Sequence, residues 1–210
     1  IAGVYQRGGR TMNDKFFDVK KEKQDRIINA SLKMFALNGY RHASTDDMVR
    51  EAAISKGLLF HYFGSKLGLY VFLYDYSTRF MLLEFSREIK AVDTDFFVLA
   101  GKMETARMRV MKMYPYMRRF LDAVQKEDCA EAAEAVREIR EKYQESLNKY
   151  IRQADFDRFV PKAKPEMVMK CVEYTLNGLT EEFSGRGGLE TEALKKEIED
   201  YLRMFAAVFQ

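Results

Sequence analysis

Apolar residues recur at helical spacing along nearly the whole chain. Between residues 22 and 38 they fall three or four positions apart, at Ile27, Ile28, Leu32, Phe35 and Ala36, the pattern of a helix with one buried face. Similar spacing predicts eight further helices, over about 45–52, 56–63, 66–89, 95–112, 115–126, 129–153, 166–183 and 191–209. Since no segment alternates as a strand does, we expect an all-α fold of about nine helices.

The first three predicted helices form a recognisable unit. Gly39 ends the first helix, Ser44 begins the second, and Ser55 begins the third after a tight turn at Ile54-Ser55. Three short helices joined in this way describe a helix-turn-helix. We therefore divide the chain into a head over 12–66 and a helical body over 67–210. The Gly-rich residues 1–11 precede Met12 and are expected to be an added or disordered tail.

Charge is unevenly distributed between these parts. The chain has 35 Lys and Arg against 32 Asp and Glu, but residues 1–66 hold 12 basic and 7 acidic residues, a net charge of +5. A basic segment on a slightly acidic body is typical of a protein whose one end meets a polyanion such as DNA. A solvated basic surface with no partner would give the same numbers, so charge alone leaves both interpretations open.

Composition excludes several classes of protein. Two Cys and two His, scattered along the chain, are too few for a disulfide framework or a structural zinc site, so no metal or cofactor is expected. No apolar run reaches 18 residues and no signal peptide is visible, which predicts a cytoplasmic protein without membrane contact. The sequence contains no HExxH, GxSxG or Gly-rich phosphate loop, and Cys129 lies in an acidic stretch. We expect no enzyme.

The third helix, SKGLLFHYF, has a composition that suits contact with another surface. Gly57 lies at its second position, although glycine costs a helix about 0.5–1 kcal/mol relative to alanine. A close approach of the backbone would justify that cost, and a recognition helix in a major groove brings such an approach. Lys56 and the free N–H groups of the same turn would face a phosphate.

The segment GYRHASTDDMVREAAISKGLLFHYFGSK, residues 39–66, closely resembles the DNA-binding helices of the TetR family of bacterial transcriptional regulators. The resemblance implies a homodimer whose two third helices enter successive major grooves of a near-palindromic operator in double-stranded DNA. It also implies a body that binds a small-molecule effector. The residues that it assigns to DNA contact are Thr45, Lys56, Gly57, Leu58, Phe60, His61, Tyr62 and Lys66.

Four positions depart from the pattern of the family. Phe60 stands where Tyr is usual, which removes a hydroxyl that could bind phosphate, and this ring could instead belong to the core together with Phe63. Ala53 occupies the usual Gly of the turn and must tolerate a less comfortable backbone. The pair Leu67-Gly68 replaces a more usual charged pair, and we expect it to loosen the first turn of the fourth helix.

The body is rich in methionine and aromatic residues. Nine of the twelve Met lie there, four of them within 103–113, and Met is common where a surface adapts to a ligand. We hypothesise a mostly apolar pocket in which Arg107 binds an anionic group; ordinary bundle core is the alternative for each residue. The predicted lining is Tyr76, Phe80, Met103, Arg107, Met111, Tyr114, Phe120, Tyr143 and Tyr174.

Two apolar faces on the helix at 166–183 exceed what the core of one protomer needs. The resemblance implies that this helix and the last one pair with their copies in a four-helix bundle. The predicted interface residues are Val168, Val172, Thr175, Leu179, Phe183, Leu194, Ile198, Tyr201 and Phe205.

Together these features predict a ligand-responsive, dimeric transcriptional regulator, a repressor that a small, largely apolar molecule releases from its operator. An alternative is a DNA-binding architectural or adaptor protein whose body is filled and takes no effector.

Overall fold

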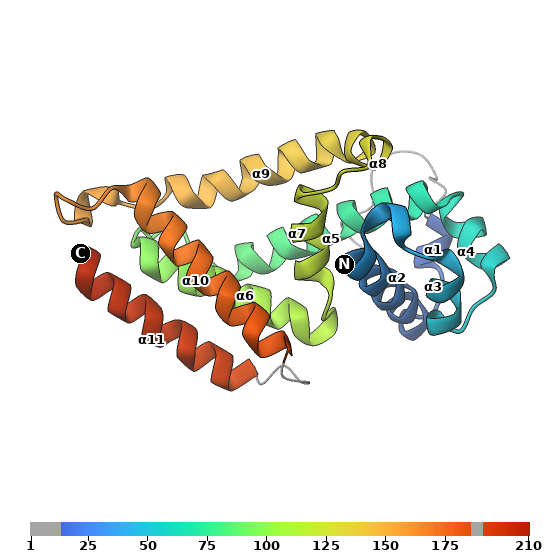
Figure 1. The fold of residues 1–210 in the computed structure, drawn as a ribbon, viewed down its shortest axis with the longest axis horizontal. Coiled ribbons are helices and arrows are strands. Elements are labelled where there is room, and N and C mark those ends of the chain that lie inside the picture. The colour runs from blue at the N-terminus through green and yellow to red at the C-terminus, as the bar shows by residue number, and fades with distance from the viewer. Residues whose placement is uncertain (1–13, 186–190) are drawn as a thin grey trace. The chain divides into compact units, whose positions relative to one another are not determined.

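The computed structural model describes residues 14–185 and 191–210, and every regular element within these ranges is a helix (Figure 1). The all-α prediction is confirmed. The expected tail over residues 1–11 lies outside the described residues. The helices are α1 (Asp14–Phe17), α2 (Lys21–His42), α3 (Thr45–Ala52), α4 (Lys56–Phe63), α5 (Lys66–Glu88), α6 (Phe96–Met113), α7 (Met117–Gln125), α8 (Ala130–Ala135), α9 (Arg137–Arg152), the 3₁₀ helix η2 (Phe156–Arg158), α10 (Pro165–Gly185) and α11 (Thr191–Phe209).

Two of these α-helices were not expected from the sequence. The four residues of α1 are too short to show a period, yet Phe16 is fully buried among the rings of Tyr62, Phe63 and Phe72. The helix expected over 129–153 is interrupted at Val136, which leaves the helical conformation at ψ 0° and is fully buried. The segment contains no Gly or Pro that would have signalled the break.

The helix boundaries in the N-terminal part follow from serine caps. The Oγ atom of Ser44 accepts a hydrogen bond from the N–H of Asp47, that of Ser55 from Leu58 and that of Ser65 from Gly68, at 3.2, 3.2 and 3.0 Å. Each bond satisfies an N–H group that a helix start leaves without a partner. Gly39 interrupts α2 with φ 66° and ψ 179°, a conformation that only glycine adopts readily, so it ends the straight part of that helix as predicted.

Ala53, at the turn between α3 and α4, adopts the left-handed conformation, with φ 52° and ψ 53°. The sequence predicted a less comfortable backbone at this position. This conformation costs an L-residue about 1–2 kcal/mol. We expect Ala53→Gly to raise the free energy of unfolding by about 0.5–1 kcal/mol, measured by thermal or urea unfolding. Ala52→Gly is the matched control, because Ala52 is helical and buried. This substitution should lower the free energy of unfolding by about 1 kcal/mol. Equal losses in both variants would contradict this prediction.

The described residues form two compact units, and the boundary does not fall at residue 66. The first unit contains residues up to Leu83 together with Arg109–Gln144, and the second contains Glu84–Met108 together with Glu145–Gln210. The helix-turn-helix therefore shares its unit with the first part of α5 and with α7. The division of function into a head and a body stays a prediction.

In the first unit, α7 packs along α2 (Figure 1). Phe120 of α7 is fully buried, with its ring centroid 6.1 Å from that of Phe35 on α2 and 5.5 Å from that of Tyr70 on α5. Hydrogen bonds join the chain on either side of α7 to α2. Before α7, the Tyr114 hydroxyl donates to Asp25, and after it, Glu127 accepts from the N–H of Tyr40. Helix α2 is thus bound along its length by a segment some 90 positions away in sequence.

The second unit has its own apolar core. Helices α10 and α11 lie side by side (Figure 1) and bury aliphatic residues against aromatic residues of α6 and of the η2 region. Among the described residues, no helix is both long and apolar enough to cross a membrane. The core residues of this unit are Phe96, Phe97, Met108, Phe159, Val168, Val172, Leu176, Leu179, Phe183, Leu194, Ile198 and Leu202.

Candidate nucleic-acid interface

Helix α4 has one face turned inward and one turned outward. Leu59, Tyr62 and Phe63 are buried, whereas Lys56, Gly57 and His61 are exposed, and Leu58 and Phe60 are partly buried. The buried residues recur at positions i, i+3 and i+4, as expected for a two-turn helix that rests on a core. The outward face therefore offers one cation, one glycine and one imidazole to a partner.

Gly57 occupies open space. A Cβ atom at this position would have no neighbour within 4 Å, and the backbone shows no left-handed φ. Neither local conformation nor internal packing requires glycine here. A surface that approaches α4 from outside would explain it, as the sequence predicted.

Tyr62 does not project with the other predicted contact residues. Its ring is buried, with the centroid 5.6 Å from that of Phe16 in α1. The prediction that Tyr62 faces DNA is corrected on this point, since the ring belongs to the core of the first unit. The sequence did not indicate this, because the four residues of α1 are too few to show a helical period. Phe63 is also buried, in contact with Phe16 and Phe72, which agrees with the core assignment.

The two predicted lysines already have partners in the protein. The Nζ atom of Lys56 lies 2.9 Å from Asp46 Oδ1, on α3. The Nζ atom of Lys66 donates to the carbonyl oxygen of Arg41 at 3.1 Å and lies 4.8 Å from the centroid of the Tyr40 ring. Burial lowers the pKa of Lys66 below its ordinary value, while Cys129 and Glu127 act in the opposite direction. Lys66 therefore links the start of α5 to the end of α2. Thr45, another predicted contact, lies partly buried at the start of α3.

Gly68 is required by packing, which corrects the expectation that the pair Leu67-Gly68 loosens α5. A Cβ atom at this position would lie 2.1 Å from the carbonyl oxygen of Phe63, a contact that no real Cβ atom makes. The N–H of Gly68 also donates to the Ser65 cap. Glycine here lets the end of α4 approach the first turn of α5 closely.

The predicted pocket residues are divided between the two units. Tyr76, Phe80 and Tyr114 meet through ring contacts in the first unit, with centroids 5.3–6.0 Å apart. Phe120, Met111 and Tyr143 are buried in the same unit. Met103, Arg107 and Tyr174 belong to the second unit.

Two of the residues in the second unit are not free to act as the pocket hypothesis supposed. Tyr174 is 69% exposed on α10, so its assignment to a buried pocket is corrected. The guanidinium of Arg107 forms an ion pair with the fully buried carboxylate of Glu104 and lies 5.6 Å from the centroid of the Phe85 ring. Its charge is thus engaged within the protein.

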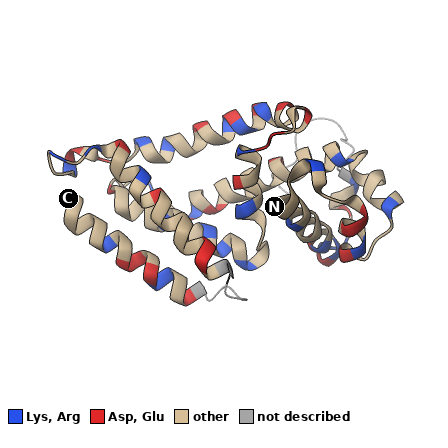
Figure 2. Cartoon of the chain, in the orientation of Figure 1, with Lys and Arg blue, Asp and Glu red and all other residues tan. Residues whose placement is uncertain are grey.

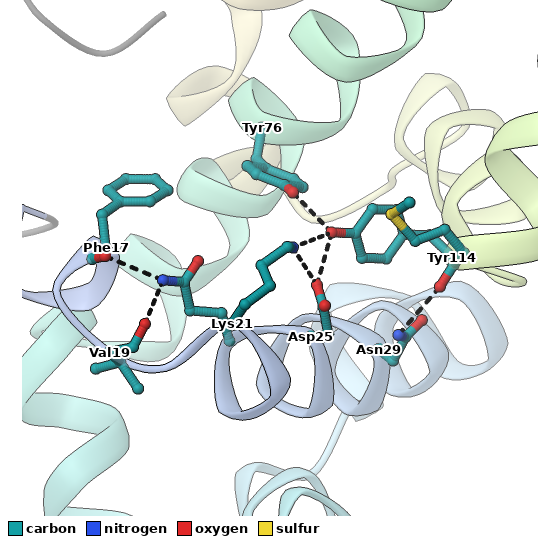
Figure 3. Close-up of polar contacts among 9 residues, drawn as sticks. Phe17, Val19, Lys21, Asp25, Asn29, Tyr76 and Tyr114 are labelled. Atoms are coloured by element: carbon teal, nitrogen blue, oxygen red, sulfur yellow. Dashed lines mark hydrogen bonds and ion pairs between the residues drawn. The ribbon is translucent and has the colours of Figure 1, made fainter. Parts of the chain in front are cut away.

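A polar cluster joins Tyr76 and Tyr114 to α2 (Figure 3). The Tyr114 hydroxyl donates to Asp25 Oδ1 at 2.8 Å, accepts from Lys21 Nζ at 3.1 Å and lies 2.8 Å from the Tyr76 hydroxyl. We call Lys21, Asp25, Tyr76 and Tyr114 the Tyr114 cluster. Burial, together with the hydrogen bonds to Tyr76 and Asp25, raises the pKa of Tyr114 well above its ordinary value, so the phenol stays protonated.

Six of the nine predicted interface residues are buried inside the protomer. They belong to the core of the second unit and have almost no surface left for a second copy, so their assignment to the interface is corrected. Thr175 and Phe205 are partly buried and Tyr201 is exposed. The six corrected residues are Val168, Val172, Leu179, Phe183, Leu194 and Ile198.

The segment that contains α3 and α4 matches a known protein family. The sequence profile of bacterial regulatory proteins of the TetR family matches residues 27–71, which span α2 to the start of α5. The match covers the helix-turn-helix and its flanking helices alone, so it identifies a segment of the TetR type within the chain. The proteins that define this profile are bacterial regulatory proteins.

A curated relative matches part of the chain. An uncharacterised HTH-type transcriptional regulator of Bacillus subtilis (strain 168), YuxN, is 41% identical over 56 residues. The match covers 27% of this chain and 19% of that relative, so the chain spans about a fifth of the length of this curated relative.

Solved structures resemble the fold of nearly the whole chain. A TetR-family regulator of Chloroflexus aurantiacus J-10-FL matches with a TM-score of 0.67 at 19% identity, over 93% of this chain and 97% of that one. The TetR-family regulator PfmR of Thermus thermophilus matches with a TM-score of 0.60 at 17% identity, over 87% and 97%. At these identities the likeness extends to the fold alone.

Proposed function

We propose that this chain is a ligand-responsive repressor that binds a near-palindromic operator as a homodimer and leaves it when a small, largely apolar molecule binds. The outward face of α4 is the observation that carries DNA binding. Lys56, Gly57 and His61 are exposed together, and Gly57 leaves room for a backbone to approach. Thr45, Leu58, Phe60 and Lys66 remain proposed contacts, Lys66 after release from Arg41.

Selection of DNA sites from a random duplex library tests this proposal. The full chain should enrich a two-fold symmetric sequence, and fluorescence anisotropy should show at least about 10³-fold tighter binding to it than to a shuffled duplex. The half-sites should lie about one helical turn apart or a multiple of it. No enrichment would contradict the proposal.

Gly57→Ala is expected to weaken binding to the selected duplex about tenfold, which corresponds to 1.4 kcal/mol. The added methyl group projects into the space that the DNA would occupy. The free energy of unfolding should stay unchanged or rise by about 0.5 kcal/mol, because alanine favours a helix. Anisotropy and thermal unfolding on the same preparation separate the two effects. Undiminished affinity would place the DNA elsewhere.

The proposed dimer interface uses the faces of α10 and α11 that the core leaves exposed. On α10, Met167, Cys171, Tyr174 and Gly178 follow one another at helical spacing and are all exposed. On α11, the exposed large apolar residues are Tyr201, Met204 and Val208. An apolar surface spread over two neighbouring helices favours association with a second copy.

Light scattering tests the dimer. The wild type should have twice the mass of one chain at micromolar concentration, whereas Tyr174→Lys should shift it towards the monomer without loss of helix content. Glu138→Lys, on exposed α9, is the control for surface charge. A monomeric wild type would defeat this part of the proposal.

The Tyr114 cluster supports a response to a ligand. Tyr76 and Tyr114 were predicted to line the effector pocket. The Tyr76 hydroxyl bonds that of Tyr114, which donates to Asp25 on α2. A molecule that displaced Tyr114 would break these bonds and alter the position of α2. A thermal-shift screen of apolar and anionic aromatic compounds, followed by anisotropy on the selected duplex, tests this. A screen in which no compound stabilises the protein or changes its DNA binding would favour the adaptor alternative.

A further inference from the structure

Helices α3 and α4, the pair that we propose to bind DNA, together carry a net negative charge. Residues 45–63 contain two basic residues, Arg50 and Lys56, and three acidic ones, Asp46, Asp47 and Glu51, for a net charge of −1 with His61 neutral. Acidic residues are visible on α3 in Figure 2. Surfaces that bind DNA are ordinarily basic. The net negative charge of α3 and α4 therefore needs a physical explanation.

Both cations of this pair are held by carboxylates of α3. Lys56 Nζ lies 2.9 Å from Oδ1 and 3.1 Å from Oδ2 of Asp46, and Arg50 forms an ion pair with Asp47. The side chains of Lys56 and Asp46 are 50% and 70% exposed. An ion pair in such contact with water is weak and can open when another anion competes.

We propose that Asp46 is a specificity-determining residue of DNA binding, which weakens attachment to arbitrary duplex by holding Lys56 and by repelling phosphate. The inference rests on the proposed function and deepens it. Lys56 leaves Asp46 only where the base contacts of a specific site offset the loss of that pair.

Non-specific affinity for DNA has an electrostatic origin. Binding to arbitrary sequence comes almost entirely from cations that neutralise phosphates and release counterions, and each such contact adds about 0.9 to the slope of log K against log salt. A lysine paired with a carboxylate releases fewer counterions, and the carboxylate itself opposes the phosphates. A specific complex also gains base contacts, so the same penalty is a smaller share of its affinity.

Asp46→Asn provides the test, because it keeps the shape and an oxygen acceptor but removes the charge. We expect the shuffled duplex to bind about fivefold more tightly at low salt, and its salt slope to steepen by about one phosphate contact. Affinity for the selected duplex should rise less, so the ratio of the two should fall at least about twofold. Both duplexes are measured by anisotropy from about 50 to 200 mM salt.

Glu138→Gln is the matched control. It removes one exposed carboxylate that is ion-paired with Lys142 on α9, so the net charge changes equally outside α3 and α4. This variant should leave affinity and slope as in the wild type. Thermal unfolding of both variants should agree with the wild type within about 2 °C, since the pairs are exposed.

Two results would overturn the inference. In one, Asp46→Asn binds the shuffled duplex with wild-type affinity and slope. In the other, it loses affinity for the selected duplex alone, which would make Asp46 a direct base contact. The proposed function fails separately, when the wild type does not distinguish the two duplexes, and the shuffled duplex still tests Asp46 in that case.

Discussion

Gly68→Ala is expected to lower the free energy of unfolding by about 3 kcal/mol and to abolish selective DNA binding. The new Cβ atom would lie 2.1 Å from the carbonyl oxygen of Phe63, and that oxygen is backbone, so it cannot rotate away. Either α5 or the end of α4 must move. Since Phe63 also packs on Phe16 and Phe72, the shift would disturb the core behind the reading helix.

Urea unfolding and anisotropy on the selected duplex measure these two effects. For stability, Gly57→Ala is the matched control, since it makes the same substitution in the same unit at a position with open space. It should fold at least as well as the wild type. If Gly68→Ala unfolded at the wild-type urea concentration, the close approach of α4 and α5 would be wrong.

Phe120→Ala is expected to cost about 4 kcal/mol, within the range for a fully buried aromatic ring. The ring contacts Phe35 on α2 and both Tyr70 and Tyr74 on α5. Its removal would leave a cavity between α7 and the two helices that it joins. Because α2 packs on α3, which in turn contacts α4, DNA binding should weaken together with stability.

Phe120→Leu, which fills most of that cavity, should recover more than half of the loss. This pair of variants also decides between two roles for Phe120, since the sequence placed it in a ligand pocket. A stable Phe120→Ala protein with altered response to ligands would support the pocket. A loss of several kcal/mol in the absence of any ligand would identify Phe120 as a core residue.

Local features of the sequence predicted the head well. The capping bonds of Ser44 and Ser55, the end of the first helix at Gly39 and the strained Ala53 all depend on residues a few positions apart. Such features are readable because turn chemistry and helix periodicity are local.

Features that depend on distant contacts could not be predicted. Periodicity identified two apolar faces on α10, but it does not say which face the protomer's own core buries, so Val172 and Leu179 were assigned to the wrong surface. The bond between Asp25 and Tyr114 joins residues 89 positions apart. The inward turn of Tyr62 depends on Phe16, in a helix of four residues.

The packing of α7 on α2 also sets an order of events during synthesis. The helix-turn-helix and the first part of α5 leave the ribosome before α7 exists, so Phe35 has no Phe120 to cover it until residue 120 has emerged. At roughly 5–20 residues per second, the interval between residues 83 and 125 lasts about 2–8 s. During that time the apolar face of the first helix is open to chaperones and to other nascent chains. A pause in translation within this interval would therefore prolong the exposure of a reading unit whose sequence is already complete.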